Sequence, residues 1–121
     1  MKIAIPSEAN TGLESMRSGH FGHAQYFTIV TFDDGMNVTE VESVQNVDHD
    51  VAGCGGVIDF VSGLGVDGIL TAGMGMPPYT RFTNSGITVY SDTTQPKVGD
   101  VVALFAEGKV APMDPNNVCR H

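Results

Sequence analysis

Residues 57–72 have the sequence VIDFVSGLGVDGILTA, and this stretch decides the fold class. Its first half carries apolar residues at helical spacing, and Gly65 is suited to end a helix. Its second half, Gly68–Ala72, is a short apolar run typical of a buried strand. A helix that leads into a strand is the connection that parallel strands require. The stretch therefore predicts an α/β fold whose sheet is at least partly parallel.

The residues before this stretch predict antiparallel pairing. Met1–Pro6 contains a short apolar strand, and Tyr26–Phe32 is rich in β-branched and aromatic residues. The second run stops at Asp33-Asp34-Gly35, where an Asp-Gly pair is a strong hairpin signal. Val38–Val47 has valines at a spacing of three, which also fits a helix. Its threonine and valine content and the preceding turn favour a bulged return strand.

The residues after this stretch add two helices and one strand. Tyr79–Asn84 is a predicted helix with prolines near its first turn, Ile87–Tyr90 a strand, and Val98–Gly108 an amphipathic helix. We find no repeat and no linker, so we expect one domain over residues 1–121, with residues 109–121 as an irregular tail. The expected architecture is a mixed sheet of about five strands with helices on both faces.

Composition limits the partners and the location that we expect. The 121 residues carry a formal net charge of −8 and no basic run, which disfavours nucleic acid. No apolar stretch approaches the roughly 20 residues of a membrane-spanning helix, and the N-terminus lacks a signal-peptide pattern. Cys54 and Cys119 have no motif spacing, which favours a reducing compartment over a disulfide framework. We therefore expect a cytoplasmic protein with no membrane partner.

Common catalytic motifs are missing from the sequence. It contains no Walker motif, no G-x-S-x-G and no H-E-x-x-H. Met1–Pro6 also lacks the acidic residue that a two-metal nuclease would need on its strand. We therefore expect no catalytic residue and no enzymatic activity.

Three ordered motifs resemble a known family. Ser18–Phe27 (SGHFGHAQYF) resembles the H-F-G-x-A-x-x-F signature of the dinitrogenase iron–molybdenum cofactor biosynthesis family, which includes NifX, NafY and the C-terminal part of many NifB proteins. Asn46 and His49, followed by Gly53-Cys54-Gly55-Gly56, resemble its second motif, and Gly68–Gly75 resembles its strand that ends in G-x-G. Position 23 is usually Arg in that family and is His here, and the position of Cys54 often holds His.

The resemblance implies a fold and a cargo. The fold would be a three-layer α/β/α arrangement of the ribonuclease-H-like type. The function would be to bind and carry, or help assemble, a metal–sulfur cofactor, with cofactor donor and recipient proteins as partners. Among stand-alone members of this length, the chain looks most like a carrier of a molybdenum–copper sulfide cluster. An iron–molybdenum or iron–sulfur cluster precursor is the alternative cargo.

The loops after the first strand and after Ala72 are the expected binding edge, because ligands of open α/β sheets bind beyond the carboxyl ends of the strands. Gly73 and Gly75 would let backbone N–H groups approach an anion, although G-x-G alone is more often a tight turn. Met74 and Met76 would form a soft apolar wall, although such methionines are more often core. The candidate cofactor-binding residues are Arg17, Ser18, His20, Phe21, His23, His49, Cys54, Gly73, Met74, Gly75 and Met76.

His20 and Cys54 are the candidate metal ligands. Imidazole suits copper, zinc and iron, and a thiolate suits copper or iron. Both positions can also be explained without any ligand. His20 would then be a solvent-facing histidine in a loop, and Cys54 a small residue in a helix entry. Arg17 and Arg81 would offset the charge of an anionic cargo if they faced it.

Two cysteines cannot supply four protein thiolates, so we expect a preformed anionic cluster that is held largely non-covalently. Two other classes of function remain open at this point. One is a regulatory or interaction module whose ancestral pocket is empty. The other is a small enzyme that acts on an anionic substrate at Gly73–Met76.

Overall fold

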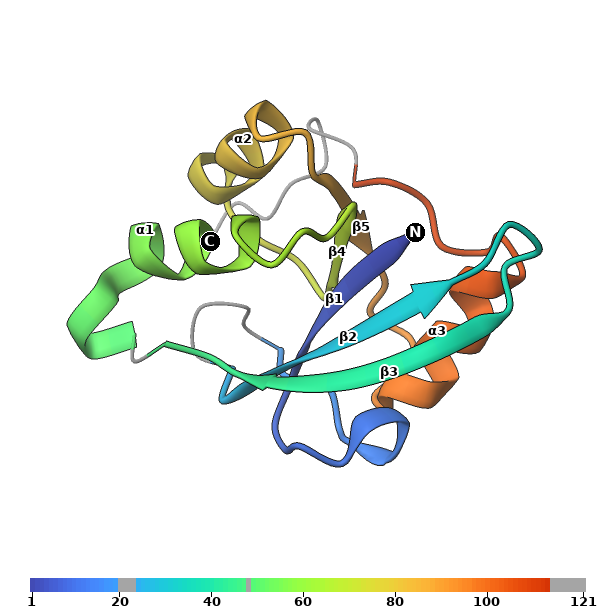
Figure 1. Cartoon of the computed structure of the whole chain (residues 1–121). Helices are drawn as coiled ribbons and strands as arrows, with labels where there is room; N and C mark the ends of the chain where they lie inside the picture. Colours follow the sequence, from blue (N-terminus) through green and yellow to red (C-terminus); the bar gives the residue numbers. More distant parts are fainter. Residues whose placement is uncertain (20–23, 48, 114–121) are drawn as a thin grey trace.

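The computed structural model describes residues 1–19, 24–47 and 49–113 (Figure 1). For residues 49–55 it describes the backbone alone. In chain order its elements are β1 (Lys2–Ser7), the short 3-10 helix η1 (Gly12–Glu14), β2 (Tyr26–Phe32), β3 (Val38–Gln45), α1 (His49–Ser62), β4 (Gly68–Thr71), α2 (Met76–Asn84), β5 (Thr88–Ser91) and α3 (Val98–Ala106). The strands form a single five-stranded sheet in the order β3-β2-β1-β4-β5.

The sheet is mixed, as the sequence predicts. β2 pairs antiparallel with both β1 and β3, whereas β4 pairs parallel with both β1 and β5. The hairpin register shifts between Thr31 and Phe32, which confirms a bulged return strand. In the turn, Asp33 Oδ1 accepts from the N–H groups of Gly35 and Asn37, each at 2.9 Å. The left-handed residue is Met36, with φ 62°, and not Gly35.

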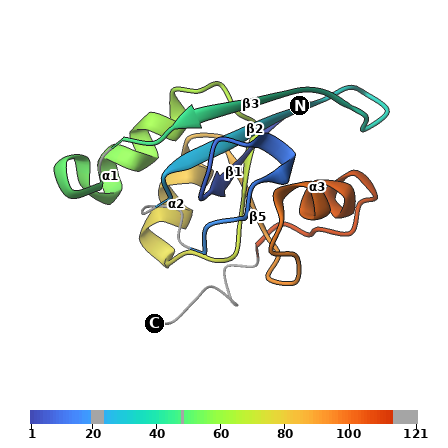
Figure 2. The same ribbon diagram turned by 90° about the horizontal axis from the view of Figure 1, so that it is seen from below.

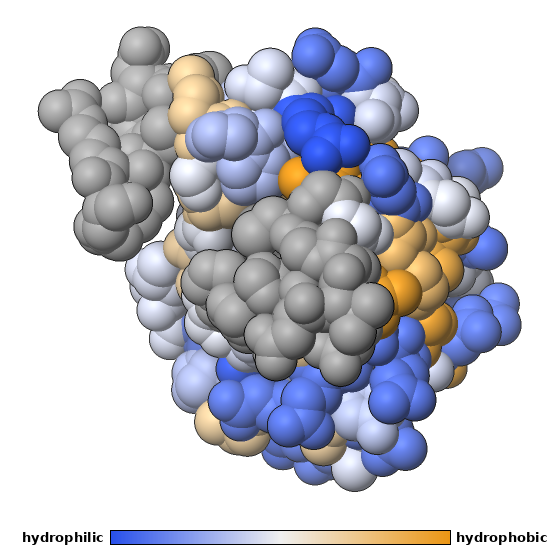
Figure 3. Space-filling view, turned by 90° about the vertical axis from the view of Figure 1, so that its left-hand side faces the viewer, coloured by the Kyte–Doolittle hydropathy of each residue, from blue (hydrophilic) through white to orange (hydrophobic). Residues whose placement is uncertain are grey.

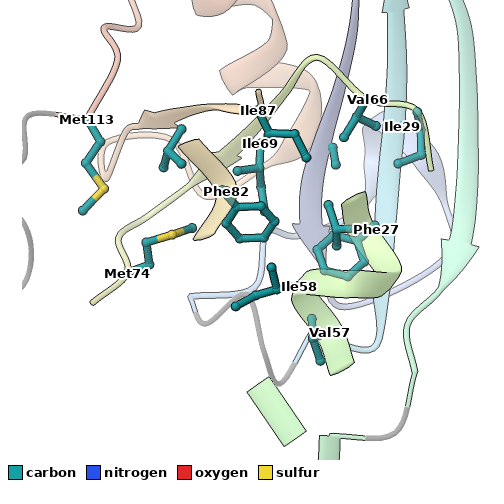
Figure 4. Packing of buried hydrophobic residues seen from close by; sticks show 13 residues of the cluster. Phe27, Ile29, Val57, Ile58, Val66, Ile69, Met74, Phe82, Ile87 and Met113 are labelled. Carbon is teal, nitrogen blue, oxygen red and sulfur yellow. The ribbon is translucent and has the colours of Figure 1, made fainter. Parts of the chain in front are cut away.

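Helices cover both faces of the sheet. Figures 1 and 2 show α1 and α2 on one face and α3 on the other, which gives three layers. The core under α1 and α2 includes Phe27, Val57, Ile69 and Phe82 (Figure 4). The core under α3 is made by residues of β1, β2 and β4 and of the helix and its C-terminal end: Ile3, Ile5, Val30, Phe32, Leu70, Val98, Val101, Val102, Phe105 and Val110. The expected α/β/α fold is therefore confirmed.

Helix α1 begins at His49, eight positions before the apolar pattern that predicted it. Its first half contains Gly53, Gly55 and Gly56, and glycine costs about 1 kcal/mol relative to alanine in a helix interior. Because of this low helix propensity, the sequence pattern did not predict the first half of the helix. Cys54 lies inside α1 rather than at a helix entry, where its sequence context had placed it.

The described part of the tail folds back onto the sheet. Met113 N–H donates to Val89 O at 2.7 Å, and Tyr90 forms an isolated antiparallel bridge with Pro112. Met113 is buried in the same cluster as Met74 (Figure 4). These contacts cover the outer edge of β5, which would otherwise present unpaired backbone groups.

We predict that the fold does not depend on metal. No helix in the described ranges is long and apolar enough to cross a membrane. Among the residues whose side chains are described, the two apolar clusters contain no histidine or cysteine. Chelator-treated protein should therefore unfold cooperatively on heating, as followed by circular dichroism. A melting curve without a transition would contradict this prediction.

Candidate functional site

The carboxyl ends of the three parallel strands all carry hydroxyl side chains. Ser7 ends β1, and its Oγ donates to Ile5 O at 2.8 Å. Thr71 ends β4, where its Oγ1 donates to Gly73 O at 3.1 Å and accepts from Gly73 N–H at 3.3 Å. Ser91 ends β5, and its Oγ donates to Ala72 O at 3.4 Å. These bonds fix the direction in which the loop after β4 leaves the sheet.

A buried arginine joins the loop after β1 to the loop after β5. The Arg17 side chain is 6% exposed, and its Nη1 donates to Asp92 Oδ2 at 3.2 Å and to Gln95 O at 2.7 Å. Its Nη2 donates to Asp92 O at 2.8 Å. The backbone N–H of Arg17 donates to Pro96 O at 2.7 Å. The two loops are therefore held as one unit.

Asp92 organises its own loop as well as the arginine. Its Oδ2 accepts from the N–H groups of Thr94 and Gln95, each at 3.1 Å, and its Oδ1 accepts from the Thr94 hydroxyl at 2.8 Å. Burial acts to raise the pKa of the Asp92 carboxyl, but these hydrogen bonds and the charge of Arg17 hold that pKa below its ordinary value. Burial lowers the pKa of Arg17, and Asp92 partly offsets that effect.

A cavity of about 160 Å³ opens where these loops meet. It lies beyond the carboxyl ends of β1, β4 and β5, the edge at which ligands of α/β sheets bind. Its lining residues come from three loops: Arg17, Ser18, Gly19, Ala72, Asp92, Thr93, Gln95 and Pro96. The sequence-predicted residues Arg17 and Ser18 are thus part of a cavity wall that also adjoins the loop beginning at Gly73.

Neither steric crowding nor a left-handed backbone explains the glycines after β4, although Gly75 is the N-cap of α2, a position that glycine favours. Neither Gly73 nor Gly75 has a positive φ. A Cβ added at Gly73 would meet nothing within 4 Å, and one at Gly75 would meet only Pro77 Cδ at 3.8 Å. At Gly68, by contrast, a Cβ would lie 2.9 Å from the Tyr90 ring. Open space at Gly73 fits the close approach of a group from outside the chain.

The same loop carries backbone donors. Within the described residues, the N–H groups of Met74, Gly75 and Met76 have no hydrogen-bond acceptor. Pro77 and Pro78 follow in the first turn of α2 and have no N–H. The donors available to an anion here therefore belong to the loop rather than to the helix end.

The two methionines of this loop lie in different surroundings. Met74 is 4% exposed and packs in the core near Phe82 (Figure 4), whereas Met76 is 45% exposed. Only Met76 can present its thioether on the surface. Figure 3 shows one face of the molecule, mostly hydrophilic with an apolar patch toward its right-hand edge.

Five other sequence-predicted residues have side chains that the structure does not describe. His20, Phe21 and His23 lie outside the described residues, and so do the side chains of His49 and Cys54. Within the described residues, no three His, Cys, Asp or Glu side chains form a group able to hold a metal ion.

Both arginines named from the sequence are in ion pairs. Asp92 compensates the charge of Arg17, and Arg81 pairs with Asp59 on the surface at 3.0 Å. Neither is a free counter-charge for an anion.

Sequence reasoning missed Asp92 and Thr71, since an acidic residue and a hydroxyl after short strands are common in turns. It also assigned no role to the Asn46 side chain. Asn46 Nδ2 donates to Ala24 O at 2.8 Å, while its buried Oδ1 has no partner. A buried acceptor without a donor lowers the stability of the fold. The Asn46 side chain contacts Ala24, two residues before the start of β2.

We predict that Asp92→Asn lowers the free energy of unfolding by about 2–4 kcal/mol at pH 7, because it leaves a buried guanidinium without its counter-charge. Asp59→Asn is the control, since its exposed pair should contribute little. Urea unfolding measures both. Because the folded pKa of Asp92 is lowered, its stabilisation is present above about pH 3.9 and is lost as pH falls through the folded value. Equal effects of the two substitutions would contradict the prediction.

Comparison with known proteins finds similar chains of the same size. The uncharacterised protein MJ0580 of Methanocaldococcus jannaschii is 31% identical over 114 residues, which cover 91% of this chain and 89% of that protein. The crystal structure of PH0822 matches with a TM-score of 0.79 and 30% identity over 95% of this chain and 98% of the other.

Two further solved structures, at 24% identity, speak for the fold alone. The apo orange protein of Desulfovibrio gigas has a TM-score of 0.76, covering 93% of this chain and 96% of that one. A putative NifB protein from Thermotoga has a TM-score of 0.70, covering 92% and 91%. The family model described as dinitrogenase iron-molybdenum cofactor matches residues 1–108, nearly the whole chain, and the chain belongs to that family.

Proposed function

We propose that this protein binds and carries, or helps to assemble, a metal–sulfur cofactor at the edge formed by the loops after β1, β4 and β5. The family concerns the dinitrogenase iron–molybdenum cofactor, which supports a cargo of this chemical class. The finer proposal is a molybdenum-containing sulfide cluster, with an iron–molybdenum or iron–sulfur precursor as the alternative. The partners would be the proteins that donate and receive it.

The observation that carries the proposal is the loop at residues 73–76. It combines open space at a glycine with three backbone N–H groups that lack an acceptor in the described chain. A sulfide-bearing anion is an acceptor and would satisfy such donors. Charge-assisted hydrogen bonds of this kind contribute about 1.5–3 kcal/mol each, so several together support useful affinity.

The proposed mode of binding rests on the small number of cysteines and on the absence of a metal-ligand group among the described residues. Two cysteines cannot ligate a cluster through four thiolates, and the described residues contain no closed set of metal ligands. We therefore propose that the cluster arrives preformed with its own sulfide and is held mainly by N–H donors. His20 and His23 would add further N–H donors to the anion.

We predict that Gly73→Ala combined with Gly75→Ala reduces cluster uptake at least tenfold without lowering the melting temperature. The added methyl groups keep every N–H but occupy the space through which an anion approaches the loop. Gly63→Ala is the matched control, because its Cβ makes only ordinary contacts, at 3.5 Å, and Gly63 precedes β4 whereas this loop follows it. The measurement is visible absorbance after incubation with tetrathiomolybdate, with and without a copper salt.

Side-chain variants separate the modes of binding. His20→Ala and Met76→Ala should each weaken uptake, and Cys54→Ala should leave most of it. Met74→Ala is less useful, because truncating that buried side chain costs about 2–5 kcal/mol of stability. If Cys54→Ala alone abolishes uptake, thiolate ligation replaces the non-covalent proposal. If the wild-type protein takes up no cluster, the carrier function itself is wrong.

A further inference from the structure

Arg17 has hydrogen-bonding capacity that the loops do not use. A guanidinium has five N–H donors in a fixed plane. Both donors of Nη1 are engaged, one by Asp92 Oδ2 and the other by Gln95 O, and one donor of Nη2 is engaged by Asp92 O. In the described part of the chain, the Nε–H and the second N–H of Nη2 have no acceptor.

The two unused donors lie on the same edge of the guanidinium. Asp92 accepts from Nη1 through Oδ2 and from Nη2 through its backbone O, and we place both bonds at the end of the group that these two nitrogens share. The remaining N–H of Nη2 then points to the side of Nε. Two parallel N–H groups on one edge are the fork with which arginine binds carboxylate and phosphate oxygens in a bidentate manner.

Arg17 belongs to a cavity wall rather than to open surface. Arg17 lines the cavity of about 160 Å³ while its side chain stays 6% exposed. Its position is fixed by three side-chain hydrogen bonds, so little conformational entropy would be lost on binding. The lining also includes Ala72 and Gly19, whose small size leaves room for a small ligand.

We infer that this cavity is a subsite for a tetrahedral oxyanion, with two of its oxygens on the Nε–H and Nη2–H fork of Arg17. The hard oxygens of such an anion suit this fork better than sulfide does, so the subsite is distinct from the N–H donors at residues 74–76. The inference deepens the proposed function, because it assigns an oxyanion form of the metal to the same sheet edge. Free molybdate and a non-metal oxyanion share this chemistry.

The charge balance sets the expected strength. Asp92 neutralises Arg17, so the anion would enter a site with no net positive charge in a protein of net charge −8. Binding should therefore be weak, and added salt should not abolish it, because salt screens the repulsion between the anion and the acidic protein. Direct hydrogen bonding to a fixed fork, rather than long-range attraction, would provide the selectivity.

The experiment titrates isotope-labelled protein with molybdate, sulfate and phosphate and follows the Nε–H resonance of Arg17. Gly19→Val is the main variant, since a Cβ there meets nothing within 4 Å and the side chain would fill cavity space without touching the ion pair. Arg17→Lys keeps the charge and removes the fork. Arg81→Lys is the matched control, because Arg81 forms an exposed pair elsewhere.

We expect a saturable shift of the wild-type resonance and a loss of affinity of at least tenfold in Gly19→Val. Arg17→Lys has no such resonance and is followed by the backbone signals of Ala72 and Thr93, which should also respond at least tenfold more weakly. The anion that binds most tightly identifies the source of the oxyanion. No saturable shift in the wild type, or equal affinity in Gly19→Val, would overturn the inference. Cluster uptake by the same proteins is read separately by absorbance, so failure of the carrier function remains distinguishable.

Discussion

The structure depends on β1, which pairs with one antiparallel strand and one parallel strand. Its one edge pairs antiparallel with β2, and its other edge pairs parallel with β4. Its side chains alternate between the two cores, with Ile3 and Ile5 under α3 and Ala4 under α1 and α2. Because β1, β4 and β5 run in the same direction, the loops that follow them share one edge of the sheet. The cavity and the glycine loop exist only because of this arrangement.

Most of the fold could be predicted because its strands are short, apolar and separated by clear turn signals. The pattern in residues 57–72 determined the crossover, and the Asp33–Gly35 turn determined the hairpin. The first half of α1 could not be predicted, because Gly53, Gly55 and Gly56 oppose helix formation locally. The docking of residues 110–113 on β5 could not be predicted from the sequence either, because it depends on pairing between distant residues.

The candidate site was predictable in location but less so in chemistry. Strand direction alone indicated that the loops after β1 and β4 would lie together. The role of Arg17 was different from the expectation, because its partner Asp92 lies 75 positions away and carries no local signal. Likewise, only the packed structure distinguishes the buried thioether of Met74 from the exposed one of Met76. Such distinctions depend on tertiary contacts that sequence spacing does not encode.

The electrostatics of this edge favour recognition by directed donors over attraction by net charge. Within the described residues each arginine is paired with a carboxylate, so the long-range field of an acidic protein repels an approaching anion. Hydrogen bonds act only at contact, where the N–H groups after β4 and the fork of Arg17 would be fixed in advance. Such a site would bind anions weakly and select them by hydrogen-bonding geometry rather than by charge. Under the proposed function, a cargo that is handed over directly by another protein would be recognised by contact of this kind rather than by long-range steering.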